Sequence, residues 1–207
     1  MRSQPPMTIY YPRVLRLCAA PLLILATISC TTPADKSLTE QLPDAPPGFD
    51  WELFEEVKVA ILKPEGWHRK VTKGNTFYTG SVSVENIDEG GFFKTGFTVQ
   101  VLSDLTKGTG HPPSVVASSL GNDIVQASYN TLLEVIPMKP SGSVSEGSIR
   151  YKNAPPGGIK ITVHKYFAAH DHHDKLYIFT FEAPDALWNN AFEQYGLPMM
   201  RRIGMTR

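Results

Sequence analysis

Two stretches in the last third of the chain decide the fold: Ile159-Lys-Ile-Thr-Val-His-Lys-Tyr-Phe-Ala168 and Leu176-Tyr-Ile-Phe-Thr-Phe-Glu182. Both stretches are rich in β-branched and aromatic residues, a composition typical of β-strands. They flank the short polar segment His170-Asp-His-His-Asp-Lys175. This arrangement predicts an antiparallel hairpin whose tip carries the histidines.

Further strands are predicted on the N-terminal side of this hairpin. In residues 77–85, Phe77, Thr79, Ser81 and Ser83 alternate with Tyr78, Val82 and Val84, so the predicted strand has one mostly polar face and one apolar face. The other runs with strand-like composition are residues 57–62, 96–103 and 147–152. Proline- and glycine-containing turns separate them.

Two helices complete the predicted pattern. Apolar residues recur at helical spacing between residues 114 and 135, and Pro137 is the expected stop signal. A second helix begins at Pro184-Asp185, and Gly196-Leu-Pro198 is expected to break it. Within its apolar stripe, Trp188, Phe192 and Tyr195 should pack on the sheet that carries Tyr177, Phe179 and Phe181. The stripe consists of Leu187, Trp188, Ala191, Phe192 and Tyr195.

The order of strands, long helix, strands and helix predicts an α+β fold, an antiparallel β-sheet flanked by helices. With 207 residues, one domain is expected. We place this domain at residues 50–207. Residues 30–49, polar and rich in proline, are predicted to be a stalk that links the domain to an anchor.

Residues 1–29 have the pattern of an export signal. Arg13 and Arg16 precede an uncharged run, Leu17 to Ile28, which is too short to span a bilayer comfortably. Ser29-Cys30 resembles the end of a bacterial lipobox, although Thr27 stands where that pattern prefers leucine. We therefore predict a signal peptide at 1–29 and lipidation of Cys30, which would hold the protein on a membrane of the bacterial envelope.

Charge and cysteine content exclude several classes of function. Residues 30–207 contain 17 basic and 20 acidic residues, a net charge of −3, so nucleic acid is not an expected partner. The two cysteines are Cys18, within the predicted signal, and Cys30. The predicted domain therefore contains no disulfide, no catalytic thiol and no zinc–cysteine site.

Two short motifs resemble the PsbP-like family, which includes bacterial envelope lipoproteins such as DcrB. Leu62-Lys-Pro-Glu-Gly-Trp67 is similar to the family's early strand and its Pro-x-Gly-Trp end. The stretch from Leu176 to Pro184, with Trp188 after it, is similar to the last long strand and the helix that follows. The resemblance spans about residues 50–205. It implies an α/β/α sandwich and no common activity, because the family includes assembly subunits and adaptors.

The histidine-rich segment is the most conspicuous polar cluster. His170, Asp171, His172 and His173 are residue types that bind zinc, copper or manganese. Consecutive ligands at a hairpin tip seldom converge on one ion, however, so an ordinary solvated turn is the main interpretation. No Gly-x-Ser-x-Gly elbow, phosphate-binding loop or nucleotide fingerprint is present, so catalysis is not expected and no cofactor is implied.

The sequence thus predicts a non-enzymatic bacterial envelope lipoprotein that faces the periplasm or the cell exterior. It would bind the membrane through its N-terminal lipid, and bind or help to assemble another envelope component. The alternative is a protein that binds a metal or small ligand, through the loop from His170 to Asp174 or through a crevice between sheet and helix. An enzyme of unfamiliar type is the third class.

Overall fold

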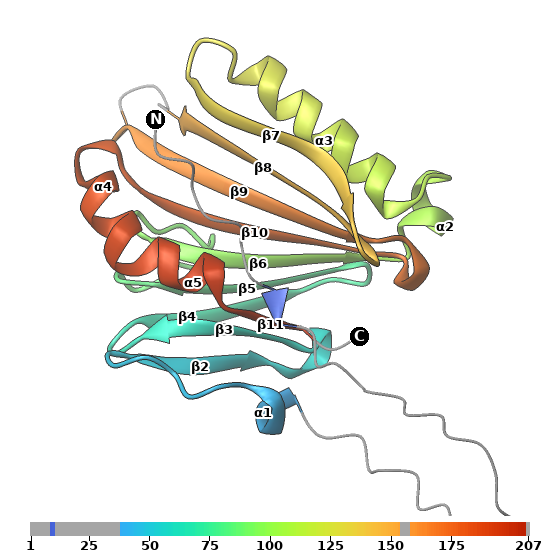
Figure 1. The fold of residues 1–207 in the computed structure, drawn as a ribbon. Helices are drawn as coiled ribbons and strands as arrows, with labels where there is room; N and C mark the ends of the chain where they lie inside the picture. Colours follow the sequence, from blue (N-terminus) through green and yellow to red (C-terminus); the bar gives the residue numbers. More distant parts are fainter. Residues whose placement is uncertain (1–8, 11–37, 154–157, 206–207) are drawn as a thin grey trace, which may run out of the picture.

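A seven-stranded antiparallel sheet forms the centre of the protein (Figure 1). The computed structural model describes residues 9–10, 38–153 and 158–205. Along the sheet the strand order is β4-β5-β6-β10-β9-β8-β7, and every neighbouring pair is antiparallel. The strands are β4 (His68–Lys73), β5 (Phe77–Ser83), β6 (Gly96–Ser103), β7 (Leu132–Ser141), β8 (Val144–Asn153), β9 (Ile161–His170) and β10 (Lys175–Pro184).

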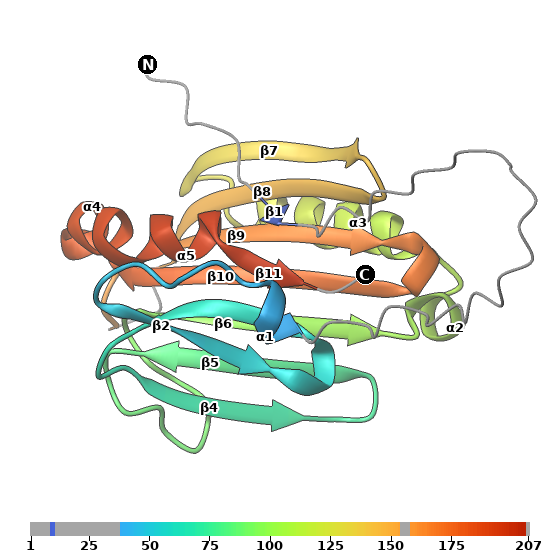
Figure 2. The same cartoon turned by 60° about the horizontal axis from the view of Figure 1, so that its bottom comes forward.

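A second, smaller sheet packs in front of the first (Figure 2). Its strand order is β1-β11-β3-β2. The strands are β1 (Ile9–Tyr10), β2 (Phe49–Phe54), β3 (Val59–Pro64) and β11 (Ile203–Met205). Together with the C-terminal helical segment, residues 188–201, this sheet covers one face of the large sheet, while α3 (Pro113–Ala127) covers part of the other.

Two hydrophobic cores lie on the two faces of the large sheet. They follow from the alternation of side chains along each strand. On β10, Phe179 and Phe181 face the small sheet and the C-terminal helical segment, whereas Leu176 and Ile178 face α3. The architecture is therefore α+β with antiparallel sheets and helices on both faces, so the predicted fold class and the predicted hairpin of β9 and β10 are confirmed.

The C-terminal helical segment differs from the prediction at one point. Gly196 to Pro198 do not break it: α4 (Trp188–Ala191) continues through a π-helical turn (Phe192–Gly196) into α5 (Leu197–Arg201). In the widened turn, the backbone N–H of Leu197 bonds to the carbonyl of Phe192. A π-turn is one of the ways in which a helix accommodates a local irregularity, here the proline that follows directly.

The predicted helix at 114–135 is too long. The helix ends at Ala127, and residues 132–135 belong instead to β7. The helical periodicity continues beyond the real end because both elements contact one core: Leu120, Ile124 and Leu132 all pack against the cluster under α3. The helical spacing of apolar residues therefore reflects the core that α3 and β7 share, and not one continuous helix.

Several short strands were not predicted. The strand predicted at 57–62 is β3, which begins at Val59 after a short 3-10 turn, while β2, β4 and β11 were not predicted. The described end of the predicted stalk contacts the domain. It contains α1 (Leu38–Gln41), and the carbonyl of Pro43 accepts a hydrogen bond of 2.7 Å from Trp51 Nε1. The start of the domain at residue 50 stays a prediction.

The predicted signal peptide and Cys30 lie outside the described residues, apart from Ile9 and Tyr10 in β1. Within the described ranges, no helix has the length and apolar character that crossing a membrane requires.

Candidate functional site

The histidine-rich loop forms a tight tip between β9 and β10. Asp171–His173 make one 3-10 turn, and Asp174 closes it with a left-handed backbone (φ 50°). His170 is buried at the end of β9, where its ring lies 5.8 Å from that of His173 and 5.7 Å from that of Tyr177. His172 and His173 are exposed.

The two aspartates of this loop bind neighbouring helices. The Asp171 carboxylate accepts hydrogen bonds from the backbone N–H and the hydroxyl of Ser114, at 2.8 and 2.7 Å, in the first turn of α3. The Asp174 carboxylate accepts the same pair of bonds from Thr106, at 2.9 and 2.7 Å, in α2 (Leu105–Thr109). Such a capping carboxylate contributes about 1 kcal/mol to stability. The loop therefore fastens α2 and α3 to the hairpin.

Two of the four predicted metal ligands already make other contacts in this loop. In the described parts of the chain, no three histidine, cysteine, aspartate or glutamate side chains lie close enough together to hold a metal ion. Of the four predicted ligands, Asp171 is engaged in capping α3, and His170 is buried beside Tyr177. The metal site stays a prediction from the sequence.

A second polar feature lies on the α3 face of the large sheet and was not predicted. Because α3 packs chiefly on β7, β8, β9 and β10, it leaves the β4–β6 half of this face uncovered. The side chains there are polar, as expected from the alternation in β5: Tyr78 and Val82 face the core, and Thr79 and Ser81 face this open half. The predicted division of β5 into two faces is thus confirmed for these residues, whereas Val84, predicted on the apolar face, lies beyond the strand and is 47% exposed.

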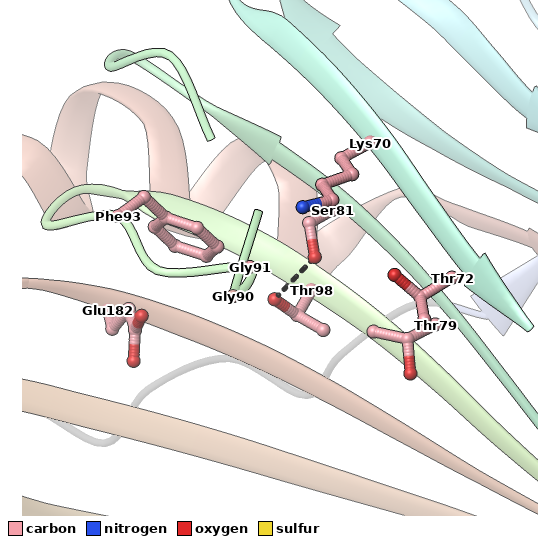
Figure 3. Close-up of a pocket in the computed structure, with 9 residues that line it drawn as sticks. All are labelled: Lys70, Thr72, Thr79, Ser81, Gly90, Gly91, Phe93, Thr98 and Glu182. Atoms are coloured by element: carbon pink, nitrogen blue, oxygen red, sulfur yellow. Dashed lines mark hydrogen bonds between the residues drawn. The ribbon is translucent and has the colours of Figure 1, made fainter. Parts of the chain in front are cut away.

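The loop between β5 and β6 lies over this half and forms one wall of an open crevice of about 290 Å³ (Figure 3). Lys70 on β4 holds the loop by donating hydrogen bonds to the backbone carbonyls of Asp88 and Glu89, the latter at 2.8 Å. At the far end, the Glu85 carboxylate accepts the backbone N–H of Thr95 at 3.1 Å. The crevice is lined by Lys70, Thr72, Thr79, Ser81, Gly90, Gly91, Phe93, Thr98 and Glu182.

The floor of the crevice belongs to a polar row that crosses five strands. In the register of the sheet, Lys70, Ser81, Thr98, Thr180 and Lys165 are successive cross-strand partners on β4, β5, β6, β10 and β9. Side chains that lie directly opposite in this way are close enough to interact. The hydroxyl oxygens of Ser81 and Thr98 are 3.2 Å apart, and the Lys165 ammonium donates to the Thr180 hydroxyl at 3.1 Å.

Two charged groups of this region have shifted pKa values. Burial raises the pKa of Glu182, an effect that Lys165 partly offsets and Glu85 reinforces. Burial also lowers the pKa of Lys165, and Glu182 opposes that change. Each group therefore compensates the charge of the other. Perturbed acid–base pairs also occur in active sites, but neither Lys165 nor Thr180 is among the residues that line the crevice.

A third feature is an exposed apolar edge, formed by Tyr129, Leu133, Val135 and Ile136. These residues lie between the end of α3 and the middle of β7, the outermost strand of the large sheet. Tyr129 is 78% exposed, Leu133 47% and Ile136 48%. They flank this edge on both sides, because Val135 is opposite Ile149 on the α3 face, whereas Ile136 is opposite Ser148 on the other face. A group of exposed apolar side chains at a sheet edge indicates a contact surface.

No protein-family model and no curated protein sequence matches the chain. Among solved structures, it is similar to the Ran-binding protein Mog1p of Saccharomyces cerevisiae, with 11% identity, a TM-score of 0.44, and coverage of 76% of this chain and 95% of that one. It is also similar to the cyanobacterial PsbP (CyanoP) of Synechocystis sp. PCC 6803, with 12% identity, a TM-score of 0.47, and coverage of 78% and 94%. Likeness at this level carries no conclusion about function.

Proposed function

We propose that the protein is a non-enzymatic lipoprotein of the bacterial envelope that binds or helps to assemble another envelope protein. The export pattern of residues 1–29 and the cysteine at position 30 support its location. The domain would then stand on the membrane surface, held by acyl chains on Cys30.

The exposed apolar edge supports the binding role. Leu133 and Ile136 each leave about half of their side chains in water, on the outermost strand of the large sheet. Covering such side chains gains roughly 25 cal/mol for each Å² of apolar area removed from water. Pro137 and Pro140 lack backbone donors, so the second half of β7 is a poor template for an added strand. The partner would therefore contact the first half of β7, largely through side chains.

This binding role predicts a specific crosslinking result. A photo-crosslinking amino acid placed at Ile136 in living cells should give one discrete adduct with an envelope protein. The same amino acid at Glu193, exposed on the C-terminal helical segment, should not. Gel mobility and mass spectrometry of the purified adducts provide the measurement.

A matched pair of charge variants tests whether the apolar edge itself is responsible. Val135→Glu should remove the adduct, because a charge at the edge opposes apolar contact. Val115→Glu should leave it intact, because Val115 is similarly exposed (46% against 39%) but lies on α3. Equal adducts from positions 136 and 193, or an adduct that survives Val135→Glu, would contradict the proposed surface.

The crevice on the large sheet supports a second candidate function, the binding of a small ligand. It lies between the sheet and the loop that joins β5 to β6, rather than between sheet and helix as the sequence-based alternative had it. Its size is at the lower end of the range for ligand pockets.

A further inference from the structure

We propose that the crevice over β4–β6 binds a small, neutral, polyhydroxylated ligand, a single saccharide unit. The proposal goes beyond the proposed envelope function and depends neither on the lipid anchor nor on the apolar edge. It rests on which groups line the crevice, on how their charges are already balanced, and on where an aromatic ring lies.

Hydroxyl groups dominate the lining. Thr72, Thr79, Ser81 and Thr98 come from three adjacent strands and line one side of the crevice (Figure 3). A hydroxyl can donate one hydrogen bond and accept two. The contact between Ser81 and Thr98 therefore leaves both groups with capacity for a ligand. A floor of this kind matches a partner that also donates and accepts at several neighbouring positions.

The charged side chains Lys70, Lys165 and Glu182 each already have partners. The Lys70 ammonium is already occupied by two loop carbonyls, and Lys165 and Glu182 offset each other. An anion placed here would meet Glu182, and a cation would meet Lys70, each at a cost in desolvation. A zwitterion would need one cationic and one anionic side chain that are not already engaged with other groups. A neutral polyol needs neither, and it can still donate to Glu182.

An aromatic ring lies beside the carboxylate. A Cβ atom at Gly96 would come within 2.6 Å of the Phe93 ring, so this ring lies directly over Gly96, the cross-strand partner of Glu182. Phe93 and Glu182 both line the crevice (Figure 3). An aromatic face beside polar groups suits a ligand with an apolar C–H face and hydroxyls around its rim, as in a pyranose ring.

The test is a ligand-observed NMR titration of the full chain, purified in detergent. Glucose, galactose and N-acetylglucosamine are the neutral probes; glucosamine, glucuronate and glycine are the cationic, anionic and zwitterionic ones. At least one neutral sugar should bind saturably, and at least tenfold more tightly than each charged probe.

Thr98→Val removes a hydroxyl at nearly constant volume and should weaken this binding at least tenfold, as should Glu182→Gln. Thr76→Val, exposed in the turn between β4 and β5, is the matched control and should change nothing.

Several results would overturn the proposal. These are no saturable binding of any neutral sugar up to its solubility limit, preference for a charged or zwitterionic probe, or binding that Thr98→Val leaves unchanged. Circular dichroism must show that each variant is folded, and Ser81→Ala replaces Thr98→Val if the latter is not. Because the titration requires no partner protein, its failure is separate from a failure of the crosslinking at β7.

Discussion

Replacing Trp188 by alanine is expected to lower the free energy of unfolding by about 3–5 kcal/mol, the range for large aromatic side chains removed from a core. Trp188 is buried, its ring stacks on Phe192 at 4.9 Å between centroids, and it lies 5.7 Å from Phe181 of β10. The variant therefore removes the contact by which the C-terminal helical segment docks on the large sheet. Urea denaturation followed by far-UV circular dichroism measures the loss.

The neighbouring residue provides the control for this experiment. Leu187 is 58% exposed and precedes Trp188 directly, so Leu187→Ala should change stability by less than about 0.5 kcal/mol. If Trp188→Ala unfolds at the same urea concentration as the parent, the helical segment does not dock as described.

The second large effect concerns pH. His164 on β9 is buried, its ring lies 5.6 Å from that of Phe192, and no described residue bonds to its Nδ1. Burial, together with the charge of Arg150, lowers its pKa from 6.5 to about 4. Between these two pH values the unfolded chain binds a proton that the folded chain does not. Stability should therefore fall by about 3 kcal/mol as the pH drops from above 6.5 to 4, at 1.36 kcal/mol per pKa unit.

Carboxyl groups also respond to acidification, so the informative quantity is the difference in stability loss between parent and variant. Burial raises the pKa values of Glu146 and Glu182, and their contribution has the opposite sign because it is lost as the pH rises. His164→Phe keeps a ring in the core and cannot be protonated. The parent should lose about 3 kcal/mol more than this variant between pH 7.5 and pH 4. Equal losses would mean that His164 is not held neutral in the folded protein.

The sequence predicted those parts of the fold that depend on local patterns. The hairpin of β9 and β10 follows from β-branched and aromatic composition on both sides of a short polar segment, and the two faces of β5 follow from alternation within that strand. Elements that depend on distant partners were missed. The short strand β11 exists because Ile203 lies opposite Ile61 in the register of the small sheet, about 140 positions earlier in the chain.

The same contrast between local patterns and distant contacts applies to the candidate site. The histidine-rich loop stands out in the sequence because its polar residues are consecutive, yet its aspartates cap helices whose first turns lie more than fifty residues away. The crevice is inconspicuous in the sequence because Lys70, Ser81, Thr98 and Glu182 come from four different strands. Only the register brings them together, and pairing between strands cannot be read from the periodicity of one of them.

Intact-mass analysis of the protein extracted from membranes tests the central claim most directly. If the protein is an envelope lipoprotein, its mass will correspond to a chain that begins at Cys30 and carries acyl groups, and a Cys30→Ser variant will lose this modification and its membrane association. A mature chain without lipid that fractionates with soluble proteins, or one that begins at a different residue, would contradict the account.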